Sequence, residues 1–127
     1  MDKRVTGLGG VFFKSQDPKK SKEWYKNHLG VEGIFHWQPA DGNGPAGQTV
    51  FSSFKEDTTY FAPSEKPFMF NFRVENLEEL LTALRAEGVT VVGKVEDYPY
   101  GKFGWILDPE GNKIELWEPK EDDGGGQ

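Results

Sequence analysis

The sequence predicts an α+β fold in which two similar βαβββ modules form a U-shaped, pseudo-twofold, curved mixed sheet. In each half, a short apolar run precedes a residue suited to cap a helix, Asp17 or Asn76. Each predicted helix then ends at a glycine, Gly30 or Gly88, and these glycines lie 58 positions apart (88 − 30). Two copies at so long a period indicate duplication within one domain rather than a solenoid.

The first half starts with the apolar run 8–14, which is bounded by turn residues and therefore predicts a strand. Asp17 can accept backbone N–H bonds as an N-cap, and Pro18 suits the first helical position. Gly30 predicts the left-handed end of this helix. Three further strands are expected, at 34–38, 48–54 and 58–62, and a flexible loop is expected at 41–45.

The second half repeats this order, with a strand at 68–74 and a helix capped by Asn76. Leucines at helical spacing predict the buried stripe of that helix, and Gly88 predicts its end. The remaining strands are expected at 89–95, 103–107 and 113–118, with a tight turn at 108–112. The segment 96–102 is rich in Tyr, Pro and Gly, and is either a ligand-contacting flap or an ordinary connection.

The length of 127 residues fits one domain, expected at 1–119 with halves of about 5–63 and 66–119. An acidic, glycine-containing tail at 120–127 is expected to be disordered. The chain has no cysteine, which excludes disulfides, thiolate metal sites and cysteine nucleophiles.

Charge and hydropathy restrict the partners. A net charge of −6 argues against a nucleic-acid partner, because such proteins usually carry a basic face. No apolar stretch approaches the ~20 residues of a membrane span, and the N-terminus lacks the core of a signal peptide, so a cytoplasmic protein is expected. No phosphate-binding loop or nucleophile elbow is present.

Two motifs carry a family resemblance. Residues 10–18, with Trp24, Tyr25 and the run 28–30, resemble the opening of vicinal-oxygen-chelate proteins, and residues 108–116 resemble their terminal hairpin. This superfamily contains glyoxalases, bleomycin resistance proteins and extradiol dioxygenases. The resemblance implies a U-shaped pocket, usually a homodimer, and in the enzymes one divalent cation such as Zn, Ni, Mn or Fe on the pocket face.

The resemblance also implies four positions for metal ligands. Counting back from the two helix caps places Gly10 and Met69 at two of them, and the middle-strand position falls near Phe51 or Ser52. Only Glu115 keeps a side chain that binds metals well. The usual metal site is therefore expected to be missing.

Strand alternation groups the remaining candidates for the ligand pocket. Glu115 is the best catalytic candidate, either as a general base or as a partner for a cationic group, and the alternative is a retained family residue without such a role. Arg73 is expected to pair with Glu115, to hold an anionic ligand, or to lie in solvent at the rim. The candidate pocket residues are Gly10, Phe12, His36, Met69, Asn71, Arg73, Trp105, Glu115 and Trp117.

The leading hypothesis is a protein that binds a small organic molecule without a metal cofactor and without an assigned catalytic residue. The first alternative is a lyase, isomerase or dioxygenase with a displaced metal site made by Glu115, His36 or Gln48. The second alternative is a dimeric structural module whose cleft is filled by aromatic side chains, which make up 14% of the residues.

Overall fold

The computed structural model describes residues 4–38, 40, 42 and 46–120. Most of the loop expected at 41–45 lies outside the described residues, and so does the expected tail after Lys120. No helix among the described residues is long and apolar enough to cross a membrane.

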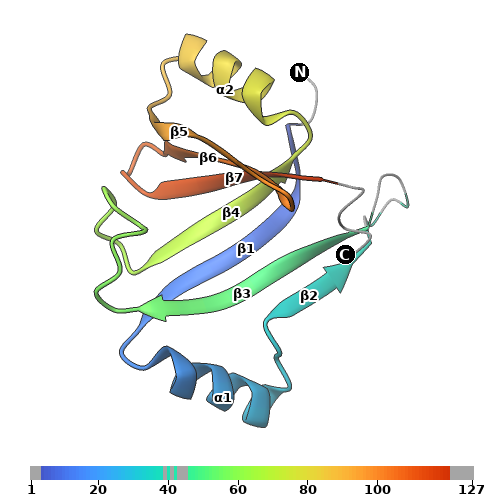
Figure 1. Cartoon of the computed structure of the whole chain (residues 1–127), viewed down its shortest axis with the longest axis vertical. Helices are drawn as coiled ribbons and strands as arrows, with labels where there is room; N and C mark the ends of the chain where they lie inside the picture. The colour runs from blue at the N-terminus through green and yellow to red at the C-terminus, as the bar shows by residue number, and fades with distance from the viewer. Residues whose placement is uncertain (1–3, 39, 41, 43–45, 121–127) are drawn as a thin grey trace.

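The described residues form seven strands and two helices, which confirms the α+β class. In chain order these are β1 Val5–Ser15, α1 Pro18–Leu29, β2 Ile34–Trp37, β3 Gly47–Lys55, β4 Phe68–Val74, α2 Leu77–Ala86, β5 Val91–Tyr98, β6 Gly101–Leu107 and β7 Lys113–Pro119. The strands make one mixed sheet in the order β2-β3-β1-β4-β7-β6-β5. β1 and β4 pair antiparallel and join the two halves, while β1 with β3 and β4 with β7 pair in parallel. Figure 1 shows α1 and α2 at opposite ends of this sheet, with β1 and β4 between them.

The strand expected at 58–62 does not form, so that prediction is wrong. Its backbone groups bond locally instead: Thr58 donates to the carbonyl of Lys55, Ala62 to that of Thr59, and Ser64 to that of Phe61. Pro63 has no N–H to offer a sheet ladder. The first half therefore supplies three strands, and the segment 56–67 is a turn-rich connection.

The segment 96–102, expected as a flap or connection, is mostly part of the two strands that flank it. β5 continues through Tyr98, which pairs with Gly101 at the start of β6. Only Pro99 and Tyr100 lie between the two strands, so this region is a tight hairpin turn.

Both helices begin at the predicted caps. Asp17 accepts a hydrogen bond from the backbone N of Lys20 at 3.1 Å. Asn76 does the same for Glu79 at 3.2 Å. Gly30 ends α1 with φ 70°. Local hydrogen bonds between residues three positions apart thus fix where each helix starts.

Replacing Asn76 by alanine is expected to cost about 1 kcal/mol of unfolding free energy, because the N–H of Glu79 loses its acceptor. Asn76→Gly should cost only a few tenths of a kcal/mol. Urea denaturation of the two variants measures the difference. Equal losses would mean that the side chain of Asn76 does not act as a cap.

The two helices cover the same face of the sheet. Tyr25 of α1 packs on Phe13 and Phe51, and Leu77 and Leu81 of α2 are buried against the second half. The opposite face, here called the inner face, carries the alternate residues of the strands. Its members include Phe12, Met69, Asn71, Arg73, Trp105, Lys113, Glu115 and Trp117.

Candidate functional site

Glu115 lies at the centre of the inner face and is 3% exposed. Its carboxylate accepts a hydrogen bond from Asn71 Nδ2 at 2.6 Å and one from Trp105 Nε1 at 3.0 Å. These partners are its cross-strand neighbours on β4 and β6. Tyr60 Oη donates a third hydrogen bond to the same carboxylate. Three neutral donors therefore satisfy a buried carboxylate that would otherwise be costly to bury.

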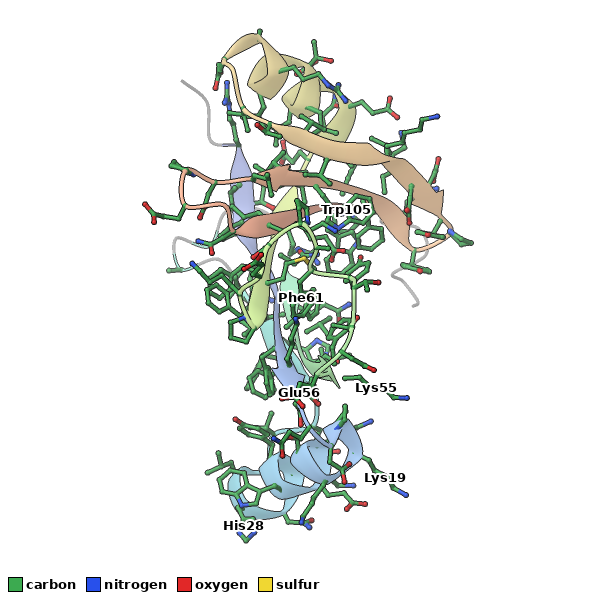
Figure 2. All side chains as sticks on the ribbon, turned by 90° about the vertical axis from the view of Figure 1, so that its left-hand side faces the viewer. Lys19, His28, Lys55, Glu56, Phe61 and Trp105 are labelled. Carbon is green, nitrogen blue, oxygen red and sulfur yellow. The ribbon has the colours of Figure 1, made fainter. Side chains whose placement is uncertain are left out.

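The segment 56–67 brings Tyr60 and its neighbour Phe61 onto the inner face. Phe61 is fully buried and packs with Phe12, Met69 and Trp105. Figure 2 shows Phe61 and Trp105 between the two helices, while His28 lies at the far end of α1. The turn-rich connection thus covers the part of the inner face that adjoins Glu115.

Burial raises the pKa of the Tyr60 phenol, and the negative charge of Glu115 raises it further. The phenol is therefore protonated at neutral pH and remains a hydrogen-bond donor to Glu115. Because the folded pKa lies above the unfolded value of about 10, this contribution to stability is fully present below pH 10 and is lost above it.

Titration of tyrosine absorbance at 295 nm tests this prediction. The phenol of Tyr60 should ionise last, and the Tyr60→Phe variant should lack that last step. If the last step persists in Tyr60→Phe, another tyrosine is responsible for it.

Lys113 is a second charged group on the inner face, two residues before Glu115. Its Nζ donates to the backbone carbonyl of Tyr60 at 2.8 Å and lies 5.2 Å and 5.6 Å from the ring centroids of Tyr60 and Trp105. Burial lowers the pKa of Lys113, and the nearby charge of Glu115 opposes that effect. The ammonium group thus places a positive charge close to the buried carboxylate.

Asn71 is 2% exposed and joins β4 to β7 at Glu115. Because Nδ2 faces the carboxylate, Oδ1 must point the other way, and this atom has no hydrogen-bond partner among the described residues. A Cβ added to Gly9 would lie only 2.1 Å from Asn71 Oδ1. The register between β1 and β4 shifts at this point, so Gly9 and Gly10 both turn toward the inner face. Glycine at position 9 is therefore what allows Asn71 to reach Glu115.

Arg73 does not pair with Glu115, although both side chains lie on the inner face. Its cross-strand neighbour is Trp117, and its Cζ lies 4.9 Å from the centroid of that ring. The ring centroid of Trp37 lies 5.8 Å from the same atom. Burial lowers the pKa of Arg73, and no carboxylate of the described residues lies within ion-pair distance of it.

The structure brings most predicted pocket residues together, but His36 lies apart from them. His36 is exposed on β2, and strand alternation directs it away from the side occupied by Trp37. Gly10 does not open a space, because the ring of Phe12 lies where its Cβ would be, at 2.7 Å. The sequence reasoning missed Tyr60 and Lys113. Lys113 alternates with Glu115 on β7 and was therefore detectable, whereas nothing local to Tyr60 indicates its position.

The residues at the expected metal positions do not fit a divalent cation. Gly10 has no donor, and Met69 offers a thioether that suits soft metals. At the middle-strand position, Phe51 faces Tyr25 on the helix side, and Ser52 offers only a neutral hydroxyl, which donates to the carbonyl of Ser53. Glu115 is already occupied by three protein donors. Among the residues that the structure describes, no three His, Cys, Asp or Glu side chains are grouped as metal ligands.

A displaced metal site is not assembled either. His36 and Gln48 are cross-strand partners on β2 and β3. Glu115 lies on β7, separated from β3 in the sheet by β1 and β4. The hydrogen-bond partners of Glu115 are Asn71, Trp105 and Tyr60, and neither His36 nor Gln48 is among them.

Solved structures share this fold. Methylmalonyl-CoA epimerase from Mycobacterium tuberculosis matches with a TM-score of 0.66 and 22% identity, over 99% of this chain and 96% of that chain. A variant of the Streptomyces coelicolor epimerase, in complex with 2-nitronate-propionyl-CoA, matches with a TM-score of 0.67 and 15% identity, over 91% and 98% of the two chains. A structure described as NAD-dependent benzaldehyde dehydrogenase from Legionella pneumophila gives a TM-score of 0.57 and 16% identity, over 87% and 98%. At these identities the likeness concerns the fold alone.

Sequence comparison identifies the family. No curated protein matches the chain significantly. The model of the Glyoxalase/Bleomycin resistance protein/Dioxygenase superfamily matches residues 8–116, which include both motifs and all seven strands in whole or in part. The chain therefore belongs to the glyoxalase/bleomycin resistance protein/dioxygenase superfamily.

Proposed function

We propose that this protein binds a small organic molecule on the inner face of its sheet, and that it does so without a divalent metal. The observation that carries the proposal is the environment of Glu115. This carboxylate is the ligand that the family resemblance retains, yet Tyr60, Asn71 and Trp105 already use its oxygens. Three of its roughly four lone-pair sites are therefore taken, so Glu115 can offer a cation at most one.

The region around Trp117 and Arg73 has the composition of a binding site. Ligand sites are mostly apolar, with a few polar groups that orient the ligand. Tyr60 and Phe61 cover the inner face next to Glu115, so the ligand is expected beyond them, on the side of Trp117. Arg73 is half-buried there and keeps donors that no described carboxylate uses.

A second candidate is a structural module with a filled cleft, and the burial of Phe61 favours it. Phe61 is fully buried with Phe12, Met69 and Trp105. If this packing extended across the whole inner face, no small molecule would enter. The two candidates therefore differ in whether any ligand reaches the indole rings of the inner face.

Metal analysis and ligand screening test the proposal together. Elemental analysis of the untagged chain should find no stoichiometric metal, and thermal melts with Zn²⁺, Ni²⁺, Mn²⁺ or Fe²⁺ should show no shift that a chelator reverses. If the unmodified chain contains stoichiometric metal and the Glu115→Gln variant does not, the proposal of a metal-free site is overturned.

The screen uses the indole N–H signals of ¹⁵N-labelled protein with a library of small aromatic and aliphatic compounds. A bound compound should shift the signal of Trp117 or Trp105, whereas Trp24, 51% exposed on α1, serves as the internal control. If no compound shifts any inner-face indole, the filled-module candidate is favoured over the binding function.

A homodimer is also proposed, on the basis of an apolar surface between the helices. Leu8 and Phe70 lie on the helix face of the two middle strands, and each is 40% exposed. A second copy would remove this surface from water. Light scattering should give twice the chain mass of 14.3 kDa, and a particle of 14.3 kDa at micromolar concentration would contradict the dimer.

A further inference from the structure

Arg73 differs from the other cationic side chains of the inner face in its partners. Lys113 donates to a backbone carbonyl, and Lys14 lies 5.9 Å from the ring centroid of Phe61. The guanidinium of Arg73 has two indole neighbours, but no acceptor among the described residues takes a hydrogen bond from it. An arginine presents five N–H donors in a planar fork, so most of its hydrogen-bonding capacity is available to a ligand.

The indole of Trp37 is immobilised beside Arg73 by a hydrogen bond and by close packing on two glycines. Its Nε1 donates to Thr49 Oγ1 at 2.9 Å, and that hydroxyl donates to the carbonyl of Leu8 at 2.6 Å. A Cβ on Gly7 would lie 2.3 Å from the ring, and a Cβ on Gly47 would lie 2.5 Å from it. Two glycines and one hydrogen-bonded threonine thus fix this indole in place.

Trp117, whose ring centroid lies 4.9 Å from Arg73 Cζ, is also immobilised. It stacks on Phe103 with ring centroids 5.8 Å apart and an interplanar angle of 8°. Its Nε1 donates to the carbonyl of Tyr100 at 3.4 Å, and a Cβ on Gly101 would lie 2.4 Å from that nitrogen. Because both indoles next to Arg73 are immobilised, binding at the guanidinium loses less free energy to side-chain ordering.

We propose that Arg73, close to both Trp37 and Trp117, binds the carboxylate of a planar aromatic acid whose ring packs against Trp37. This inference rests on the proposed binding function and names its ligand class. A guanidinium receives a carboxylate through two parallel hydrogen bonds, and a partly desolvated one does so more strongly. The flat ring of the acid suits the indole of Trp37, where offset or edge-to-face contacts add to the burial of apolar area. Trp117 is 8% exposed and already stacked on Phe103, so it positions Arg73 and does not receive the ring.

The test measures affinity for one probe and two controls by the indole N–H signals of the full chain. The probe is 2-naphthoate, and the controls are 2-naphthamide, which has the ring without the charge, and acetate, which has the charge without the ring. We expect 2-naphthoate to shift the signals of Trp37 and Trp117 saturably, with a dissociation constant at least about tenfold below that of either control. The signal of Trp24 should not move.

Two variants assign the carboxylate to Arg73. Arg73→Gln should weaken binding of 2-naphthoate about tenfold or more and leave the binding of 2-naphthamide unchanged. Lys14→Gln removes one positive charge from the other end of the inner face. It should change the affinities for 2-naphthoate and 2-naphthamide by no more than about twofold. Unchanged backbone amide spectra and thermal melts establish that each variant is folded.

The outcomes separate this inference from the proposed function. If 2-naphthoate and 2-naphthamide bind equally well, or if Arg73→Gln has no effect, the carboxylate site is overturned while small-molecule binding stands. If 2-naphthyl phosphate binds more tightly than 2-naphthoate, the site belongs to phosphate esters and the carboxylate assignment is wrong. If 2-naphthoate moves no indole signal up to millimolar concentration, the inference fails, and the library screen then decides the binding function by itself.

Discussion

Glu115→Ala is expected to lower the unfolding free energy by about 3 kcal/mol or more, because it removes the acceptor of three donors at once. Asn71 and Trp105 are 2% and 6% exposed, so their donors are left buried without this acceptor. The charge of Lys113 also loses the carboxylate that offsets it. Domains of this size are stable by roughly 5–15 kcal/mol, so the loss is a large fraction of the total.

Urea denaturation measures this effect, with two variants for comparison. Glu115→Gln keeps one acceptor oxygen but turns an NH₂ group toward other donors, so its loss should be smaller than that of Glu115→Ala. Glu110→Ala, in the exposed turn before β7, should change the free energy by no more than about 0.5 kcal/mol. A loss below about 1 kcal/mol for Glu115→Ala would contradict the described network.

Gly101→Ala is expected to lower the unfolding free energy by about 3 kcal/mol, because two destabilising effects add. Gly101 has φ 149°, a conformation that residues with a side chain rarely adopt. Its Cβ would also lie 2.4 Å from Trp117 Nε1 and 2.8 Å from the backbone carbonyl oxygen of Glu118. The backbone of a central strand cannot move aside cheaply, so the clash persists in the folded state.

Gly111→Ala is the matched control for this prediction. Gly111 has φ 82°, but nothing lies within 4 Å of its added Cβ, so this variant measures conformational strain without a clash. Gly111→Ala should lower the unfolding free energy by about 1 kcal/mol. If both alanine variants lose the same free energy in urea denaturation, contact with Trp117 contributes nothing to the need for glycine at 101.

Local signals made much of the fold predictable from the sequence. The caps Asp17 and Asn76 bond to residues three positions ahead, so the helix starts depend on nothing distant. β4 was expected at 68–74 and forms there, between Pro67 and the cap of α2. Alternation along β4 and β7 also placed Asn71, Arg73 and Glu115 on one face, as the structure has them.

The partners within that face could not be predicted, because they depend on register between strands. Parallel pairing of β4 with β7 puts Asn71 opposite Glu115 and Arg73 opposite Trp117. If the pairing of β4 with β7 were shifted by two residues, every side chain would keep its face, but Arg73 would lie opposite Glu115 in place of Asn71. Tyr60 was missed for a related reason. Its segment forms turns instead of the expected strand, and its position on the inner face depends on contacts with Glu115 and Lys113, which lie far along the chain.

The hydrogen bonds of Tyr60 are also expected to affect the unfolding rate. Its hydroxyl meets Glu115, 55 positions away, and its carbonyl meets Lys113, 53 positions away. Contacts that close so long a loop are slow to form, so this part of the structure is expected to consolidate after the folding transition state. Tyr60→Phe should therefore speed unfolding in a denaturant-jump experiment and leave the refolding rate almost unchanged. If unfolding accelerates as expected, the contacts of the segment 56–67 set the lifetime of the native state.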